Sequence, residues 1–436
     1  FTWPSHGPTY LFVDQPTMGV VYSDASGLSC EKYLFSLPPG VVYLNCASRS
    51  PMLRSVEAVG HQAVSLKNHP WQIADNGIAD NVRAQFAELI GCHARDVALT
   101  PSTSYAMSQV AHNIWKLGRI EAGDVILVLQ NQMSSNVYAW QRLSRQVGAK
   151  LLAVCDVCDD GWDVALEKCI RQEVAAGRHV ALCALPHFLW TDGSGPINFL
   201  QLRQVLDELS PRKRSCLVVD ATQSLGVVPI DVKAAGIDWL ACSVHKWLFG
   251  PYGMSLVYVA EDWSKNPMTE PIVQDEHNRL GADGDICLPF ELTPHVGYAE
   301  TFQDGAKKFD SGGRLNPILL PMVSRALQQV LEWQPNRIAS RLAQLTQRCV
   351  EGTERLKLGT PKSHAPHMLG IRPGSEVEVT YHMQWADAAC SYLKERGIHV
   401  SSRAGCLRIA PHLYNDEADI DALLDALGEL QESSKG

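Results

Sequence analysis

The sequence predicts an α/β protein in which helices cover a mostly parallel sheet and a smaller α+β domain follows. Two observations support this fold class. Short apolar runs alternate with helical patterns from residue 123 to about residue 210, which is typical of parallel sheets. Polar residues directly follow several of these runs, as expected where the carboxyl ends of strands line a ligand crevice. The 436 residues, 46% hydrophobic and 19% charged, suffice for two globular domains.

Composition excludes several functional classes. The formal net charge is -9 and there is no long basic run, which argues against nucleic acid as a partner. No apolar run approaches the roughly 18 residues that would span a membrane, and the start of the chain lacks the pattern of a signal peptide. We therefore expect a cytoplasmic protein, although an organelle stays open because the sequence begins with Phe1.

Thirteen cysteines, an odd number scattered through apolar segments, indicate reduced thiols rather than a disulfide framework. Cys155 and Cys158 have the C-x-x-C spacing of redox or metal-binding pairs. No second pair and no nearby histidine completes a zinc site, so we expect a structural role for them and no metal centre.

The first 40 residues are rich in Pro, Gly and Ser and predict an extended arm. A short strand at 41–45, a helix from Pro51 toward Leu66 and a helix over Ile78–Ile90 that Gly91 ends should follow. A strand at Val97–Thr100 then leads into a helix from Tyr105 to Leu117.

The turn between that strand and helix carries Ser102, Thr103 and Ser104. Free backbone N–H groups at a helix start, together with hydroxyl groups, form an anion site. The alternative is ordinary capping, since Ser and Thr begin many helices without any ligand.

The alternating region predicts strands at 125–129, 150–154 and 180–185 and helices near 137–147, from Val164 and from Leu200. Further apolar runs at 216–219, 239–242 and 254–259 extend the sheet. Asp220-Ala221-Thr222-Gln223 ends the first of these runs, and Ser243-Val244-His245-Lys246 ends the second.

A carboxylate and a lysine at two neighbouring strand ends can hold a pyridine ring and form an imine with its aldehyde. Pyridoxal phosphate (PLP) is the cofactor with both groups. The two motifs resemble those of class V aminotransferase-fold enzymes, which include cysteine desulfurases, selenocysteine lyases, kynureninases and isopenicillin N epimerases. The resemblance spans about residues 41 to 430 and implies fold type I, with a seven-stranded type of sheet in a large PLP-binding domain.

The resemblance also implies roles for individual residues. Lys246 would carry the cofactor and move protons at the substrate Cα, and Asp220 would keep the ring nitrogen protonated. Gln223 would donate to the ring hydroxyl oxygen. The phosphate would be held by hydroxyl and imidazole groups, namely those of Ser102, Thr103, Ser104, Ser243 and His245.

Met133 occupies the place from which an aromatic residue or histidine covers the ring in the family. It can cover a ring face by dispersion, or it can simply belong to the core. Gly313 lies in a loop, 308–317, that resembles the family loop entering the neighbouring subunit's site, which implies a homodimer with shared sites. Desulfurases carry a threonine at this position, so the resemblance does not imply a side-chain contact to the phosphate here.

Four residues are candidates for binding an amino-acid substrate. Arg408 lies in a segment that resembles the family motif whose arginine grips the substrate carboxylate, and its planar fork suits that task. Arg403 is a second candidate, and a surface ion pair is the alternative for both. Trp190 would form a wall of the pocket, and Asn136 belongs to the Ser-Asn-x-Tyr-x-Trp pattern after a strand.

The expected domains are the arm at 1–40, the large domain at 41–318, whose first part can pack on the small domain, and the small domain at 319–436. The small domain should contain helices over 319–333, 336–356, 385–396 and 416–430. It should also contain a strand at 368–371 and a pair of strands at 398–403 and 406–410.

The cofactor motifs do not determine which reaction the enzyme catalyses. The desulfurase branch needs a cysteine on a loop between Arg403 and Arg408, and only Cys406 lies there, in the strand expected at 406–410. The kynureninase branch has a tyrosine before the lysine and a histidine in place of Gln223. We therefore expect a lyase-type reaction at Cα or Cβ of an α-amino acid, with transamination as the alternative. Desulfuration, epimerisation and a non-catalytic role are less expected.

Overall fold

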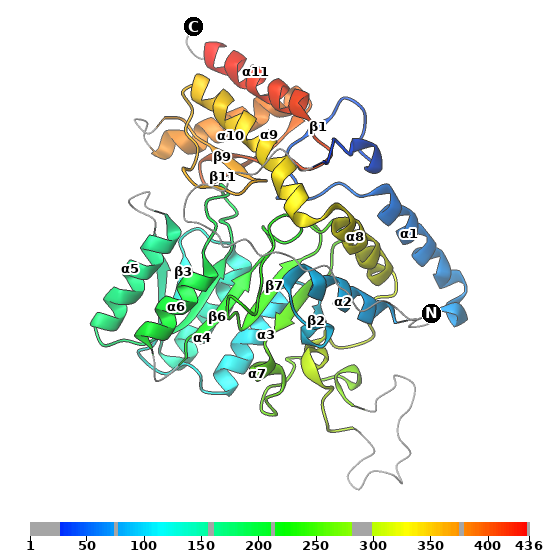
Figure 1. The fold of residues 1–436 in the computed structure, drawn as a ribbon, viewed down its shortest axis with the longest axis vertical. Coiled ribbons are helices and arrows are strands. Elements are labelled where there is room, and N and C mark those ends of the chain that lie inside the picture. Colours follow the sequence, from blue (N-terminus) through cyan, green and yellow to red (C-terminus); the bar gives the residue numbers. More distant parts are fainter. Residues whose placement is uncertain are drawn as a thin grey trace.

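The computed structural model describes residues 27–73, 77–155, 161–210, 214–280, 299–374 and 379–433. Figure 1 shows a large sheet flanked by helices, with the C-terminal helices grouped at one end of the molecule. No helix within the described ranges is long and apolar enough to cross a membrane.

The large sheet has seven strands in the order β2-β8-β7-β6-β5-β3-β4. Only β8 runs antiparallel to its neighbours, and the other adjacent strands are parallel. The predicted α/β class and seven-stranded sheet are therefore confirmed. The strands are β2 (Val97–Thr100), β3 (Val125–Leu129), β4 (Lys150–Val154), β5 (Val180–Pro186), β6 (Cys216–Asp220), β7 (Trp239–Ser243) and β8 (Ser255–Val259).

Two apolar clusters cover the two faces of this sheet, because alternate residues of a strand point to opposite sides. Ile126 and Val128 lie in the cluster formed with α3 (Thr103–Lys116) and α4 (Tyr138–Val147). Val125, Leu127 and Leu129 lie in the opposite cluster. That cluster includes side chains of α1 (Arg54–Ser65), α2 (Ile78–Ile90), α5 (Trp162–Ala175), α6 (Phe199–Leu209) and α8 (Leu319–Trp333).

The C-terminal part contains a three-stranded antiparallel sheet of β11 (Ser401–Arg403), β12 (Cys406–Ile409) and β9 (Leu369–Ile371). Its helices are α9 (Pro335–Arg355), α10 (Val379–Glu395) and α11 (Glu417–Ser433). The predicted pairing of 398–403 with 406–410 holds only for β11. The preceding β10 (Ile398–His399) pairs in parallel with β1 (Val42–Tyr43), so the start of the large domain is joined to the C-terminal part. The boundary at residues 318 and 319 stays a prediction.

The described part of the N-terminal arm lies on the body of the protein. A short turn of 3₁₀ helix, η1 (Lys32–Leu34), precedes Phe35, which is 1% exposed. The Phe35 ring packs against Phe249, Trp333 and Tyr414, with ring centroids 5.0 to 6.1 Å apart. The rest of the predicted arm, 1–26, lies outside the described residues.

Helix starts are the main differences from the predicted elements. α1 begins at Arg54 instead of Pro51, α3 at Thr103 instead of Tyr105, and α10 at Val379 instead of Trp385. The irregular stretch after β8 contains α7 (Glu261–Ser264), η6 (Glu276–Asn278) and η8 (Gly305–Phe309), and 281–298 lies outside the described residues.

Candidate active site

Asp220 is the last residue of β6 and is 7% exposed. Its Oδ1 accepts a hydrogen bond of 3.0 Å from the backbone N–H of Thr222. Burial raises the pKa of Asp220, while the contacts with Thr222 and the charge of Lys246 lower it. Within the described residues this carboxylate has no ion-pair partner, so it can accept a proton or a hydrogen bond from a cationic ligand group.

Lys246 lies three residues after the end of β7, in a tight turn closed by the hydrogen bond from Gly250 N to Val244 O, 2.8 Å. Burial lowers the pKa of Lys246 to about 8, and the charge of Arg408 acts in the same direction. Its amine forms no hydrogen bond with the residues that the structure describes. A fraction of this amine is therefore unprotonated near neutral pH, the form that attacks an aldehyde.

Hydroxyl groups from three elements gather at the start of α3. Ser102 is the N-cap, and its Oγ accepts from the Tyr105 backbone N–H at 3.1 Å and lies 3.0 Å from Ser104 Oγ. Thr103 Oγ1 lies 2.8 Å from Ser243 Oγ at the end of β7 and 3.4 Å from Thr222 Oγ1 after β6. Such a helix start favours a negatively charged group such as a phosphate.

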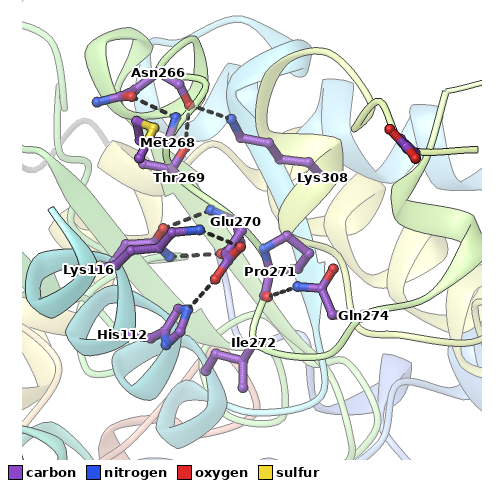
Figure 2. Close-up of polar contacts among 12 residues, drawn as sticks. His112, Lys116, Asn266, Met268, Thr269, Glu270, Pro271, Ile272, Gln274 and Lys308 are labelled. Carbon is purple, nitrogen blue, oxygen red and sulfur yellow. Dashed lines mark hydrogen bonds and ion pairs between the residues drawn. The ribbon is translucent and has the colours of Figure 1, made fainter.

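The segment at 270–272, after β8, is hydrogen-bonded to the side of α3 (Figure 2). The amides of Asn113 and Gln109 form hydrogen bonds with the backbone of Glu270, and Gln109 Oε1 also accepts from the N–H of Ile272. The Glu270 carboxylate pairs with His112 at 3.1 Å and with Lys116. This segment therefore fixes the helix whose first turn carries Ser102, Thr103 and Ser104.

His245 and Ser243 flank the turn before Lys246. The His245 ring stacks on Tyr252, with ring centroids 4.6 Å apart. Burial, with the charges of Lys246 and Arg49, lowers the pKa of His245 to about 4, so the imidazole is neutral near pH 7. The predicted phosphate contact of His245 stays a prediction, and a neutral ring would provide it by hydrogen bonding.

Gln223 is 6% exposed and its amide is held by two neighbours. Oε1 accepts from the Trp247 indole at 2.8 Å, and Nε2 donates to Ala47 O at 3.1 Å. The amide group has a second N–H that remains for a ligand oxygen. Gly226 completes this loop with φ +100°, and a Cβ there would lie 2.3 Å from Trp247 O, so the motif needs glycine at this position.

Arg408 and Trp190, two of the predicted substrate residues, are in direct contact. Arg408 is 1% exposed, Nη1 donates to Trp190 O at 2.6 Å, and Nη2 lies 3.4 Å from Asn45 Oδ1. Its Nε has no partner within the described residues. Burial and the charge of Arg403 lower the pKa of Arg408 to about 9. The alternative of a surface ion pair is wrong for Arg408, because it is buried and pairs with no carboxylate in the described ranges.

Arg403 also faces Trp190, with its guanidinium carbon 5.7 Å from the ring centroid, against 5.9 Å for Arg408. Trp190 itself donates from its indole nitrogen to Asn131 O at 2.7 Å. Three of the four predicted substrate residues thus come together from the segment after β5 and the β11–β12 hairpin.

The fourth, Asn136, is 1% exposed, and its Oδ1 accepts from the Trp140 indole at 2.9 Å. Its Nδ2 has no partner within the described residues, which leaves this atom for a ligand. Met133, three residues earlier, is 40% exposed and therefore is not a core residue. Covering a ring face stays a prediction for it.

Gly313 follows a buried anchor. Asp310 pairs with Arg83 at 2.5 Å and accepts from the N–H of Leu99 at 2.8 Å, and Ser311 N donates to Leu99 O at 2.9 Å. The loop at 308–317 is therefore anchored beside the end of β2, next to the turn that carries Ser102. Gly313 has φ +80° and nothing within 4 Å of a Cβ, so conformation and not space favours glycine there.

Several residues of the site were not predicted from the sequence. Asn45 contacts Arg408, Thr222 Oγ1 accepts from the N–H of Ser243 at 3.1 Å, and Ala47 contacts Gln223. Thr222 belongs to the quoted Asp220 motif and could have been found there. Asn45 and Ala47 follow the short strand at the start of the large domain, and the β1–β10 pairing together with the bridge between Asn45 and Ala410 brings them to the site.

Together these groups fit PLP. A buried carboxylate suits a protonated ring nitrogen, an amine with a lowered pKa suits the aldehyde, and hydroxyls at a helix start suit the phosphate.

Comparison with solved structures supports the same fold. A structure of C-DES, with 18% identity and a TM-score of 0.75, covers 92% of this chain and 99% of that one. A second, titled as the cystine C-S lyase C-DES with its product cysteine persulfide, has a TM-score of 0.72, 18% identity and coverage of 89% and 97%. A cysteine desulfurase of Thermococcus onnurineus has a TM-score of 0.73, 18% identity and coverage of 92% and 97%.

Sequence comparison identifies the family. An uncharacterized aminotransferase of Bacillus subtilis is 25% identical over 87% of this chain and 91% of its own length. A probable cysteine desulfurase of Pyrococcus abyssi is 24% identical over 86% of each chain. The family model for aminotransferase class-V matches residues 52–423. The chain therefore belongs to the aminotransferase class-V family and is a PLP-dependent enzyme.

Proposed function

We propose that this enzyme cleaves the C–S bond of a cysteine-type α-amino acid as a lyase, without passing the sulfur to a cysteine of its own. Two relationships support the choice of bond. Several relatives are named as cysteine desulfurases, and one neighbour by fold is titled as a cystine C-S lyase. Desulfuration, which the sequence analysis ranked lower, thus has the most support among the relatives' names.

The surroundings of Cys406 favour a lyase over a desulfurase. Cys406 lies in β12, is 0% exposed, and its Sγ accepts from Arg372 Nε at 2.8 Å. Burial raises the pKa of this thiol to about 11. A thiol that accepts sulfur must be accessible and ionised, and Cys406 is neither.

The side chains divide the chemistry among them. PLP, when bound, withdraws electrons from the substrate Cα. Lys246, with a pKa of about 8, can take the Cα proton and return one. Asp220 holds the proton of the ring nitrogen, and Gln223 donates to the ring oxygen. Arg408, with a free Nε, binds the substrate carboxylate beside Trp190.

Product analysis tests the proposal. The purified enzyme is incubated with L-cystine and with L-cysteine, and pyruvate, ammonia, alanine and sulfide are measured. A lyase produces pyruvate and ammonia, and Cys406→Ala should leave the rate unchanged. Alanine as the main product would overturn the proposal in favour of desulfuration. Pyridoxamine phosphate with a keto acid would indicate the alternative, transamination.

We also infer a homodimer whose sites are shared through the Gly313 loop. Exposed apolar side chains after β7 and β8 support a subunit contact: Tyr252, Met268, Ile272 and Val273 are 38% to 58% exposed, and Val273 lies against Gly312 of this loop. Sedimentation velocity should show a dimer at micromolar concentration. A monomer with full activity would contradict the inference.

A further inference from the structure

His367 lies two residues before β9, in the C-terminal part of the chain, and is 0% exposed. Its Nε2 is 2.7 Å from the backbone oxygen of Gln223 in the large domain. A carbonyl oxygen only accepts, so Nε2 carries the proton and donates. Nδ1 is then the unprotonated nitrogen, and it has no partner within the described residues.

The imidazole is neutral, because burial lowers the pKa of His367 to about 3. The titratable groups that act on it are also histidines: His364 contributes to its shift, and His367 in turn shifts His187 and His412. Burial lowers the pKa of all three of these neighbours. Its role is therefore that of a neutral hydrogen-bond donor, constant across the working pH range.

Gln223 is thus fixed from three parts of the chain. The segment after β1 supplies Ala47 O for its Nε2, the turn after β7 supplies the Trp247 indole for its Oε1, and the C-terminal part supplies His367 for its backbone oxygen. Trp247 also packs edge-on against the His367 ring, with centroids 4.2 Å apart. Because Trp247 follows Lys246 directly, the same contacts hold the lysine turn.

We propose that His367 is a positioning residue that sets the place of the Gln223 amide and so the strength of its hydrogen bond to the cofactor ring. The proposal rests on the role of Gln223 given above. Loss of the donor leaves the buried Gln223 oxygen unpaired, and residue 223 must shift to satisfy it. Through this contact the C-terminal part helps to hold residue 223 in place.

Purely apolar packing would not need a histidine at this place. The ring contacts Trp247 and, at 5.6 Å, Phe188, and a phenylalanine would fill the same space. The distinguishing feature is the donor. His367→Phe removes it and keeps the shape, whereas His367→Gln keeps an N–H at about the reach of Nε2.

The test measures the absorption of the bound cofactor in the absence of substrate. The visible absorption band of the PLP-loaded enzyme is titrated with pH for the parent, His367→Phe and His367→Gln. A weaker bond from Gln223 disfavours negative charge on the ring oxygen, so the midpoint in His367→Phe should rise by about half to one pH unit. In His367→Gln the midpoint should lie close to that of the parent. Cofactor affinity should be highest in the parent, lower in His367→Gln and lowest in His367→Phe.

The matched control is His187→Phe, which replaces a neighbouring buried imidazole that has no bond to Gln223 in the described structure. It should leave the midpoint unchanged even if it lowers the melting temperature. Should His367→Phe fail to fold, His367→Asn replaces it, since its amide is too short to reach the oxygen. Equal midpoints in the parent and in the folded donor-free variant would overturn the proposal. A wrong substrate assignment would change none of these spectra.

Discussion

Replacement of Arg408 should change substrate binding and folding stability in opposite directions. Arg408 is 1% exposed and pairs with no carboxylate in the described part of the chain, and its pKa falls from 12.5 to about 9. At 1.36 kcal/mol per pKa unit, keeping this charge buried costs on the order of a few kcal/mol. The native protein tolerates this cost, and we infer that the buried charge is kept because it binds the substrate carboxylate.

A bidentate, charge-assisted pair in a cleft is worth about 2 to 4 kcal/mol, so Arg408→Ala should weaken amino-acid capture by roughly 30 to 1000-fold. Arg408→Lys should recover only part of this, because an ammonium group lacks the planar fork. Substrate-induced changes of the cofactor spectrum measure the affinity. Cofactor content should stay at the level of the parent.

Stability is measured with Arg408→Met, which keeps much of the side-chain volume and removes the charge. Its melting temperature without substrate should equal or exceed that of the parent, despite the lost bonds to Trp190 and Asn45. Arg403→Met is the matched control, with a guanidinium at a similar distance from Trp190. A destabilised Arg408→Met, together with normal substrate affinity in Arg408→Ala, would refute the reasoning.

Three further predictions concern the cofactor lysine, acid stability and the loop anchor. Borohydride should attach the cofactor to Lys246, and Lys246→Ala should fold but carry no covalent label in a peptide map; a label elsewhere would be inconsistent with the site. His187 and His367 have their pKa lowered from 6.5 to about 3, so the unfolded chain binds more protons below pH 6.5. Stability should be complete above about pH 6.5 and fall toward pH 3, by up to about 1.4 kcal/mol per pH unit for each histidine, with a shallower slope in His187→Phe on urea denaturation. Asp310→Ala should cost about 3 kcal/mol by removing the buried carboxylate partner of Arg83, which keeps only the exposed Asp80 as an ion-pair partner, and an unchanged urea midpoint would show that the buried pair is dispensable.

The sequence by itself determined the elements whose signals are local. Strand and helix periods predicted the large sheet, and the limits of α2 and α8 match the predicted helices because Gly91 and the apolar pattern define them. Asp220 and Lys246 were identifiable because Asp220 ends a buried strand and Lys246 lies three residues after another, and parallel strands place such residues at one edge.

Only the tertiary structure decided which distant residues meet. The pairing of β1 with β10 joins segments more than 350 residues apart and brings Asn45 to Arg408, and no local pattern specifies such a contact. The same holds for His367 and Gln223, 144 residues apart. The burial of Arg408, which excludes a surface ion pair, also depends on packing between segments and not on the identity of its neighbours in sequence.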